Sequence, residues 1–175
     1  VEVVSVGGEC KEVNIYTGAE REVLRIAVVG LGEWEFHPSA MQQVATTEPF
    51  TPEQYRYLLI PDVALQKGRV AIAALAPYAS IWSNNGYAFA RELPAEQLPV
   101  RAYAIADIMP YRPKELKRRY KGVGVELLKR DTPLGIEAVR RATGMRAGGD
   151  CTLALTSVAG QNWVVELNAL PNVTK

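Results

Sequence analysis

Short β-type patterns open the chain. Residues 1–6 are rich in Val, Gly7-Gly8 supplies a two-residue turn, and residues 11–16 alternate roughly between polar and apolar side chains, which predicts a β-hairpin. The largely apolar run from Leu24 to Leu31 predicts a buried strand. The first 32 or so residues thus contain three predicted strands and no helix. We expect them to be the last strands of a sheet that begins upstream of residue 1.

A composition typical of a linker follows at residues 37–54, with three prolines among Ser, Thr and Gln. Beyond it the pattern predicts the order β-α-β-β-β-α-β-α-β-β, which favours an α+β fold, a mixed sheet with helices packed on it. We therefore expect segments 1–36, 37–54 and 55–175. The predicted strands are 55–60, 80–82, 87–90, 101–109, 123–129, 151–158 and 162–167, and the predicted helices are about 63–76, 113–121 and 134–143.

Positive charge is concentrated in the second half of the chain. The formal net charge is only +1, yet the stretch from Arg112 to Arg146 holds eleven Lys and Arg against four Asp and Glu. A helix over 113–121 would bring Leu116 and Tyr120 together on one face and leave Lys and Arg on another. Such a face is either simply solvated or a surface for an anionic partner, since Lys and Arg bind phosphates well.

Residue types that support catalysis are sparse. The single histidine, His37, lies in a predicted loop and is best interpreted as solvated or locally hydrogen-bonded. Asp62, Asp107 and Asp131 lie nearest to apolar strands, but Asp62 and Asp131 have the position of helix caps. No carboxylate spacing indicates a two-acid catalyst or a metal site. We expect no catalytic, cofactor-binding or metal-binding residue in this chain.

Several further features limit the class of protein. Cys10 and Cys151 are far apart and outside any CxxC pair, so neither a disulfide framework nor a zinc site is expected. Gly30-Leu31-Gly32 lacks the third glycine of a nucleotide-binding loop and precedes acidic residues, so we interpret it as a turn. No run approaches the roughly 20 apolar residues of a membrane span, and we expect a cytoplasmic location. The first residue is Val1 and not Met, so we expect residues upstream.

Three motifs resemble a known family. Tyr57 to Lys67 is similar to the Tyr-x-x-x-Pro-Asp-x-Ala-x-x-Lys/Arg stretch of the THUMP-like domain found at the C-terminus of certain class I S-adenosylmethionine-dependent methyltransferases. Lys129 to Leu134 resembles the Arg-x-x-Pro-Leu turn of that domain, and Gly148 to Leu155 resembles its last turn and strand. One departure is Gly68, where the family often has Ala after the Lys. The stretches 1–6 and 9–12 resemble the final strands of the methyltransferase domain.

The resemblance implies a C-terminal fragment of a methyltransferase whose THUMP-like domain binds substrate RNA and is itself not catalytic. It implies that S-adenosylmethionine binds the full-length protein and not this fragment, and that the domain docks on the methyltransferase core of the same chain. The alternative is a structural or dimerisation domain without nucleic-acid binding, for which Trp34 and Trp82 are candidate contacts. The oligomeric state stays open. Tyr120 within the basic run, with Tyr111 just before it, is expected to offer a ring to unpaired bases. The candidate RNA-binding residues are Lys67, Lys114, Lys117, Arg118, Arg119, Tyr120, Lys121, Lys129 and Arg130.

Overall fold

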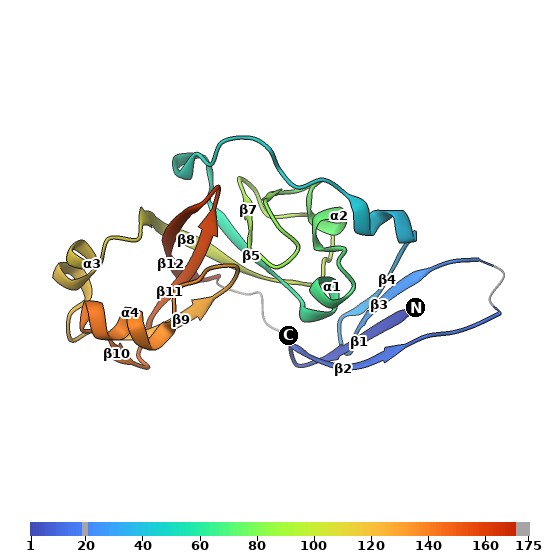
Figure 1. Cartoon of the computed structure of the whole chain (residues 1–175), viewed down its shortest axis with the longest axis horizontal. Coiled ribbons are helices and arrows are strands. Elements are labelled where there is room, and N and C mark those ends of the chain that lie inside the picture. The colour runs from blue at the N-terminus through green and yellow to red at the C-terminus, as the bar shows by residue number, and fades with distance from the viewer. Residues whose placement is uncertain (19–20, 171–175) are drawn as a thin grey trace. The chain divides into compact units, whose positions relative to one another are not determined.

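The computed structural model describes residues 1–18 and 21–170 (Figure 1). Contacts divide the chain into two compact units that alternate along the sequence. Unit 1 contains Val1–Thr47 and Leu59–Arg101, and unit 2 contains Glu48–Leu58 and the chain from Ala102 onward. The three consecutive segments suggested by the sequence stay a prediction, and the last part of the third, 171–175, lies outside the described residues.

Unit 1 begins with a four-stranded sheet of order β2-β1-β3-β4, coloured blue in Figure 1. Its strands are β1 (Glu2–Val6), β2 (Glu9–Asn14), β3 (Leu24–Val28) and β4 (Gly32–Phe36). β1 pairs antiparallel with β2 and parallel with β3, and β3 pairs antiparallel with β4. The predicted hairpin is confirmed, and the predicted strand is present as β3, which buries Leu24, Ile26 and Val28 but exposes Arg25. That these strands end a methyltransferase sheet stays a prediction.

The fourth strand, β4, was not predicted from the sequence. The turn at Gly30–Gly32 is present, and the strand starts within it. Glu33 and Glu35 are exposed and Trp34 between them is half-buried, which is the period of two expected for a strand with one solvated face. The acidic residues concealed this alternation.

Two short helices, α1 (Val63–Lys67) and α2 (Ala71–Leu75), replace the single helix predicted over 63–76. The helix breaks at Gly68-Arg69, where Arg69 has a left-handed φ of 57°. α1 packs on the four-stranded sheet, and a Cβ on Gly68 would lie 2.7 Å from Cδ1 of Ile26 in β3. This close approach favours glycine at position 68.

The remaining elements of unit 1 are short. The segment of linker composition, residues 37–54, holds two 3-10 turns. η1 (Pro38–Gln42) belongs to unit 1, and η2 (Pro52–Gln54) belongs to unit 2. β6 (Ser80–Ile81) and β7 (Ala88–Ala90) match two predicted strands, and they pair antiparallel. β5 (Tyr57–Pro61) begins in unit 2 and ends in unit 1.

Unit 2 contains a mixed sheet of order β10-β9-β11-β12-β8. β9 pairs parallel with β11, whereas β12 pairs antiparallel with both β11 and β8. The predicted strands are all present, and the two-residue β10 is an addition that the sequence did not indicate. The strands are β8 (Val100–Pro110), β9 (Gly124–Lys129), β10 (Arg146–Ala147), β11 (Cys151–Val158) and β12 (Gln161–Ala169).

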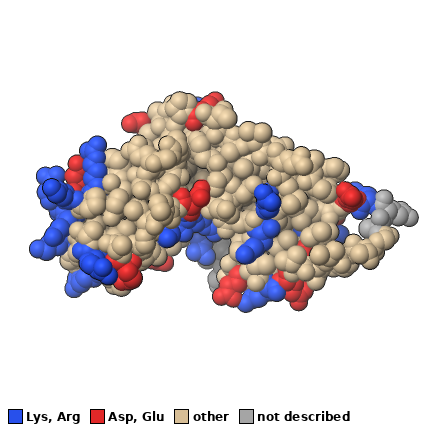
Figure 2. Space-filling model, viewed as in Figure 1, with Lys and Arg blue, Asp and Glu red and all other residues tan. Residues whose placement is uncertain are grey.

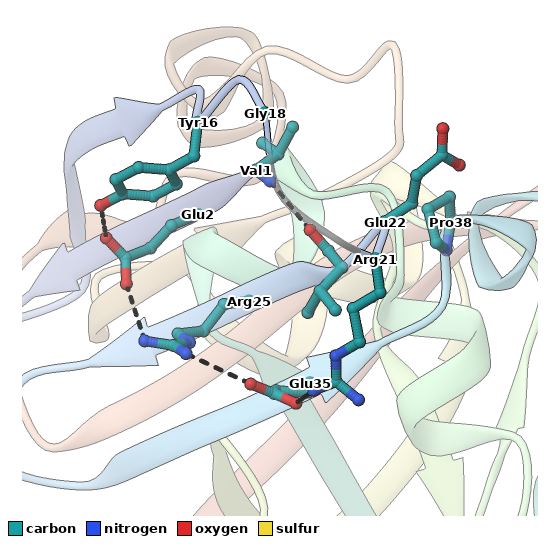
Figure 3. Close-up of a pocket in the computed structure, with 10 residues that line it drawn as sticks. Val1, Glu2, Tyr16, Gly18, Arg21, Glu22, Arg25, Glu35 and Pro38 are labelled. Carbon is teal, nitrogen blue, oxygen red and sulfur yellow. Dashed lines mark hydrogen bonds and ion pairs between the residues drawn. The ribbon is translucent and has the colours of Figure 1, made fainter.

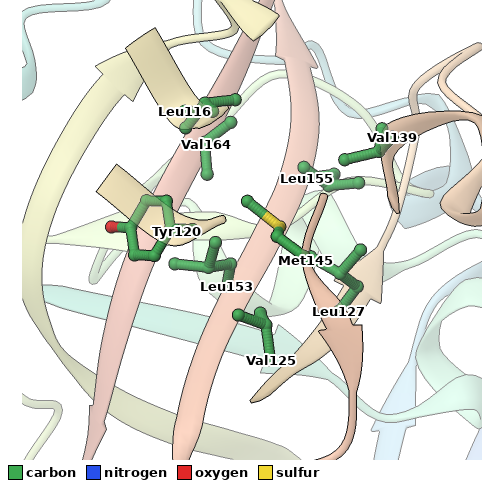
Figure 4. Packing of buried hydrophobic residues seen from close by; sticks show 9 residues of the cluster. All are labelled: Leu116, Tyr120, Val125, Leu127, Val139, Met145, Leu153, Leu155 and Val164. Atoms are coloured by element: carbon green, nitrogen blue, oxygen red, sulfur yellow. The ribbon is translucent and has the colours of Figure 1, made fainter. Parts of the chain in front are cut away.

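Helices α3 (Pro113–Tyr120) and α4 (Ile136–Thr143) pack against each other and cover one face of this sheet. Their inward side chains meet alternate residues of the strands in a single apolar core (Figure 4). Burying each such large side chain contributes roughly 1.5–3 kcal/mol. The expected α+β fold is thus confirmed. The core consists of Leu116, Tyr120, Val125, Leu127, Val139, Met145, Leu153, Leu155 and Val164.

Candidate nucleic-acid interface

Helix α3 divides an apolar side from a basic one. Pro113 at its first position suits a helix start, and basic residues in its last turn complement the helix dipole. Leu116 and Tyr120, four residues apart, are 1% and 4% exposed and point into the core. The exposed side carries Lys114, Lys117 and Arg118, and Lys121 follows at the C-cap. This amphipathic arrangement is the one predicted from the sequence.

The basic residues of this region differ in whether a carboxylate neutralises them. Arg112 pairs with Glu115 at 3.2 Å, and Arg119 pairs with two acids. In the part of the chain that the structure describes, Lys114, Lys117, Arg118 and Lys121 form no ion pair. Their charge therefore remains available to an anionic partner.

Arg119 has a different setting from its neighbours on α3. Its guanidinium donates to Asp107 of β8 and to Glu166 of β12, each at 2.5 Å. The hydrogen bond to Asp107 raises the pKa of Arg119 above its ordinary value. Arg119 also lies over the ring of Tyr120, 5.2 Å from the ring centroid. These contacts fasten α3 to the sheet, so Arg119 is a poor candidate for a phosphate ligand.

The structure places Tyr120 where it cannot stack on a nucleotide base, contrary to the role expected from the sequence. Its ring belongs to the core and its hydroxyl donates to Glu166 at 2.8 Å. Burial, followed by this hydrogen bond, raises the pKa of the Tyr120 hydroxyl. Tyr111, the other aromatic near the basic run, is half-buried against the same core.

The other sequence candidates are dispersed. Lys129 is exposed at the end of β9, and Arg130, which follows it, is half-buried and has partners of its own. Lys67 is exposed in the last turn of α1 and belongs to unit 1, whereas the other candidates belong to unit 2. Within unit 2, the structure therefore brings together the candidates on and just after α3.

Two arginines that the sequence did not single out extend the basic side of α3. The backbone N–H of Gly122 donates to Gly144, and that of Arg146 donates to Val123, both at 2.9 Å. These bonds join the end of α3 to the segment after α4, where Arg146 is exposed, and Arg141 is exposed in the last turn of α4. Only the packing of α3 on α4 could have identified them. Figure 2 shows Lys and Arg gathered where α3 and α4 lie.

We call these six exposed side chains the basic surface. Within the described ranges none of them has a carboxylate partner. Arg140, next to one member, is excluded because its guanidinium donates to the carbonyls of Val125 and Arg146 at 3.0 and 2.7 Å. The basic surface consists of Lys114, Lys117, Arg118, Lys121, Arg141 and Arg146.

The candidates for catalysis have structural roles. His37 caps η1, since its Nδ1 accepts from the backbone N–H of Ser39 at 3.2 Å, which confirms a locally hydrogen-bonded loop histidine. Asp62 caps α1, as predicted, by accepting from the N–H of Ala64 at 2.8 Å. Asp131 does not cap α4, whose N-cap is Gly135; it adopts a left-handed φ of 49° in the preceding turn.

The turn at Gly30–Gly32 does not fit the cofactor that the resemblance implies for the longer protein. The chain passes from the Gly30–Gly32 turn directly into β4, whose exposed Glu33 and Glu35 would repel an anionic group.

Cys10 and Cys151 are free and half-buried. Over residues 1–18 and 21–170, no group of three or more His, Cys, Asp or Glu could hold a metal ion. The same residues include no helix long and apolar enough to cross a membrane.

Unit 1 has a hollow beside its four-stranded sheet, lined by charged residues that pair with one another (Figure 3). Glu2 accepts from the hydroxyl of Tyr16 at 3.0 Å and lies 3.7 Å from Arg25. Glu35 pairs with Arg25 at 3.2 Å and with Arg21 at 2.6 Å. Because these charges are satisfied within the sheet, we assign no ligand to the hollow.

By fold and surface, unit 2 is an α+β domain that presents a basic helical face. Residues 100–169 match the family model described as THUMP domain-like, which covers β8 through β12 together with α3 and α4. This region of the chain is thus similar to the THUMP-like family, as the motifs at Lys129 to Leu134 and Gly148 to Leu155 suggested, whereas the motif at Tyr57 to Lys67 lies outside the matched residues and stays a prediction. A search of curated proteins finds no match.

The chain is also similar in fold to a solved structure, a "putative methyltransferase" from Porphyromonas gingivalis W83. The TM-score is 0.77, and the similarity covers 97% of this chain at 21% sequence identity. The chain spans 45% of the length of that protein. At this identity the likeness extends to the fold, and the activity of the longer protein does not transfer by itself.

Proposed function

We propose that this chain is part of a methyltransferase and that its THUMP-like region binds substrate RNA through the basic surface. The observation that carries the proposal is the group of exposed cations on α3 that no carboxylate neutralises. Clustered cations are what binding to a phosphate backbone requires. The match of residues 100–169 to the THUMP-like family supports RNA as the polyanion.

The catalytic part of the proposal concerns the longer protein. We expect S-adenosylmethionine to bind outside this chain, in the domain to which this chain would be attached, and we expect a cytoplasmic location. The likeness in fold to a "putative methyltransferase" of about twice the length supports this reading. The chain itself would position RNA and would not transfer the methyl group.

The test is fluorescence anisotropy of a labelled structured RNA titrated with the 175-residue chain. Binding should weaken steeply as salt rises, because each neutralised phosphate releases counterions. The triple variant Lys117→Glu, Arg118→Glu, Lys121→Glu should lower affinity for every RNA sequence alike, whereas Lys11→Glu in unit 1 should not.

Unchanged binding in the triple variant would show that α3 is not the contact. Absence of RNA binding by the wild type, with dimers in gel filtration, would favour the alternative of a docking or dimerisation domain. Trp34 and Trp82, the candidate contacts for that alternative, are both half-buried, and the ring of Trp82 packs edge-on against Phe89 at 6.0 Å.

A further inference from the structure

Among the described residues, the basic surface has cations without carboxylate partners, and the two aromatic residues near it are Tyr120, which is buried, and Tyr111, which is half-buried. From this we infer that it binds the backbone of a double-helical RNA segment and not unpaired bases. The inference rests on the proposed function and specifies which form of RNA the surface accepts.

The aromatic residues near the surface are occupied by the protein core. Tyr120 is 4% exposed, with its ring among Leu116 and Val164 and its hydroxyl on Glu166. Tyr111 is half-buried against the same residues. Proteins that bind single-stranded RNA stack its bases on aromatic rings, each worth about 1–3 kcal/mol. Tyr120 cannot supply this affinity for unpaired bases, and Tyr111 is only partly accessible.

The free cations lie along α3 and beside its end. Lys114 and Lys121 are seven residues apart, which corresponds to about 10 Å of helix. A Cβ on Gly144 would lie 3.2 Å from Cγ of Lys121, so the end of α4 lies directly against the end of α3. Arg141 and Arg146 therefore extend the row beyond α3 and do not form a separate patch.

The carboxylates on α3 and α4 themselves lie outside this row. Glu115 on α3 is paired with Arg112, and Glu137 lies in the first turn of α4, at the opposite end from Arg141 and Gly144. Double-stranded RNA is recognised mainly through its shape, its phosphates and its 2′-hydroxyls, because side chains cannot read its deep major groove. A row of exposed cations suits such a phosphate backbone.

The experiment compares three probes at one salt concentration: a 20-base-pair RNA duplex, an unstructured single-stranded RNA of 20 nucleotides and a DNA duplex of the same length. The duplex RNA should bind roughly tenfold more tightly than the single strand, because the buried ring of Tyr120 gives unpaired bases no platform on which to stack. Six free cations limit the slope of log K against log salt to about −5 for the duplex. The DNA duplex separates general polyanion binding from recognition of RNA.

Matched variants test which cations take part. Arg141→Gln and Arg146→Gln should each reduce the slope by about 0.9, as for one lost phosphate contact. Lys11→Gln in unit 1 should leave it unchanged. Equal or tighter binding of the single strand, or unchanged slopes in both arginine variants, would overturn the inference while leaving RNA binding intact. If none of the probes binds, the proposed function itself fails.

Discussion

Glu166 of β12 accepts hydrogen bonds from two consecutive residues of α3, the guanidinium of Arg119 at 2.5 Å and the hydroxyl of Tyr120 at 2.8 Å. Arg119 also donates to Asp107, the residue of β8 that lies opposite Glu166 in the pairing of β8 with β12. The last turn of α3 is thereby fixed to two neighbouring strands. The neighbouring Lys117 and Arg118 make none of these contacts and face solvent.

This relationship predicts different outcomes for two adjacent arginines. Arg119→Met should lower the free energy of unfolding by about 1 kcal/mol, because Asp107 and Glu166 lose their partner in a partly solvated site. Arg118→Met should change it by less than about 0.5 kcal/mol, as is usual for an exposed residue. Urea denaturation followed by tryptophan fluorescence measures both.

In RNA binding, Arg118→Met should have the larger effect of these two variants. Arg118→Met should reduce the salt slope by about 0.9, as expected for a lost phosphate contact. Arg119→Met should leave the slope unchanged, since its guanidinium is already neutralised. A reduced slope in Arg119→Met together with wild-type stability would contradict the anchoring role.

The setting of Tyr120 predicts that the free energy of unfolding decreases at alkaline pH. Burial and the hydrogen bond to Glu166 raise the pKa of Tyr120 in the folded state above its ordinary value of 10.0. Its contribution to stability is therefore complete below pH 10 and decreases above it, because the unfolded chain releases this proton first. Tyr120→Phe should be less stable than wild type by about 1 kcal/mol at pH 8.

The difference between the two proteins should shrink from pH 10 upward, in urea denaturation at pH 8, 10 and 11. Tyr16, Tyr78 and Tyr111 also have raised pKa values, so both proteins should still lose stability in this range. Parallel losses of stability in wild type and Tyr120→Phe would show that the hydroxyl is not protected by folding.

Two adjacent glycines between β10 and β11 predict unequal costs for the same substitution. A Cβ on Gly149 would lie 2.5 Å from the carbonyl oxygen of Gly124, whereas one on Gly148 meets no atom within 4 Å. Both have positive φ, 112° and 73°. Gly148→Ala should therefore cost only the left-handed strain, about 1 kcal/mol.

Gly149→Ala should cost clearly more than Gly148→Ala, because the loop must also move away from β9. Thermal denaturation of the two variants against wild type measures the difference. Similar melting temperatures would mean that the loop can shift away from Gly124 without loss.

Local patterns predicted most elements, whereas packing decided what they do. The alternation and turn signals located the longer strands of unit 2 and its two helices, and α4 ends, as the predicted range 134–143 implies, before Gly144, whose φ is 73°. The sequence could not show that Arg69 would break the first helix, since a left-handed φ at a non-glycine residue depends on tertiary context.

In the candidate site, too, local patterns predicted the elements and tertiary packing decided what the side chains do. The i, i+4 spacing of Leu116 and Tyr120 correctly indicated a buried face, and that burial excludes the stacking role we had assigned to Tyr120. Arg119 appeared equivalent to Arg118 because Asp107 and Glu166, its partners, are distant in sequence. Arg141 and Arg146 became candidates only through the contact between Lys121 and Gly144.

Asp62 combines a role that the sequence predicted with one that it did not. Its Oδ1 accepts from the N–H of Ala64, the expected cap of α1, and also from the hydroxyl of Ser5 at 2.6 Å, a residue 57 positions earlier. Ser5 is fully buried in β1. The carboxylate therefore links the start of α1 to the four-stranded sheet.

A double-mutant cycle separates these two functions. Asp62→Ala should cost about 2 kcal/mol, the sum of a lost cap and a lost hydrogen bond to a buried hydroxyl. Ser5→Ala should cost about 1 kcal/mol, and the double variant should be no less stable than Asp62→Ala alone, because the hydroxyl left without a partner is then absent. Asp62→Asn, which keeps the Oδ1 acceptor, is the control and should lose less. Additive losses in the urea-derived free energies would show that Ser5 and Asp62 act independently and that the cap alone fixes α1.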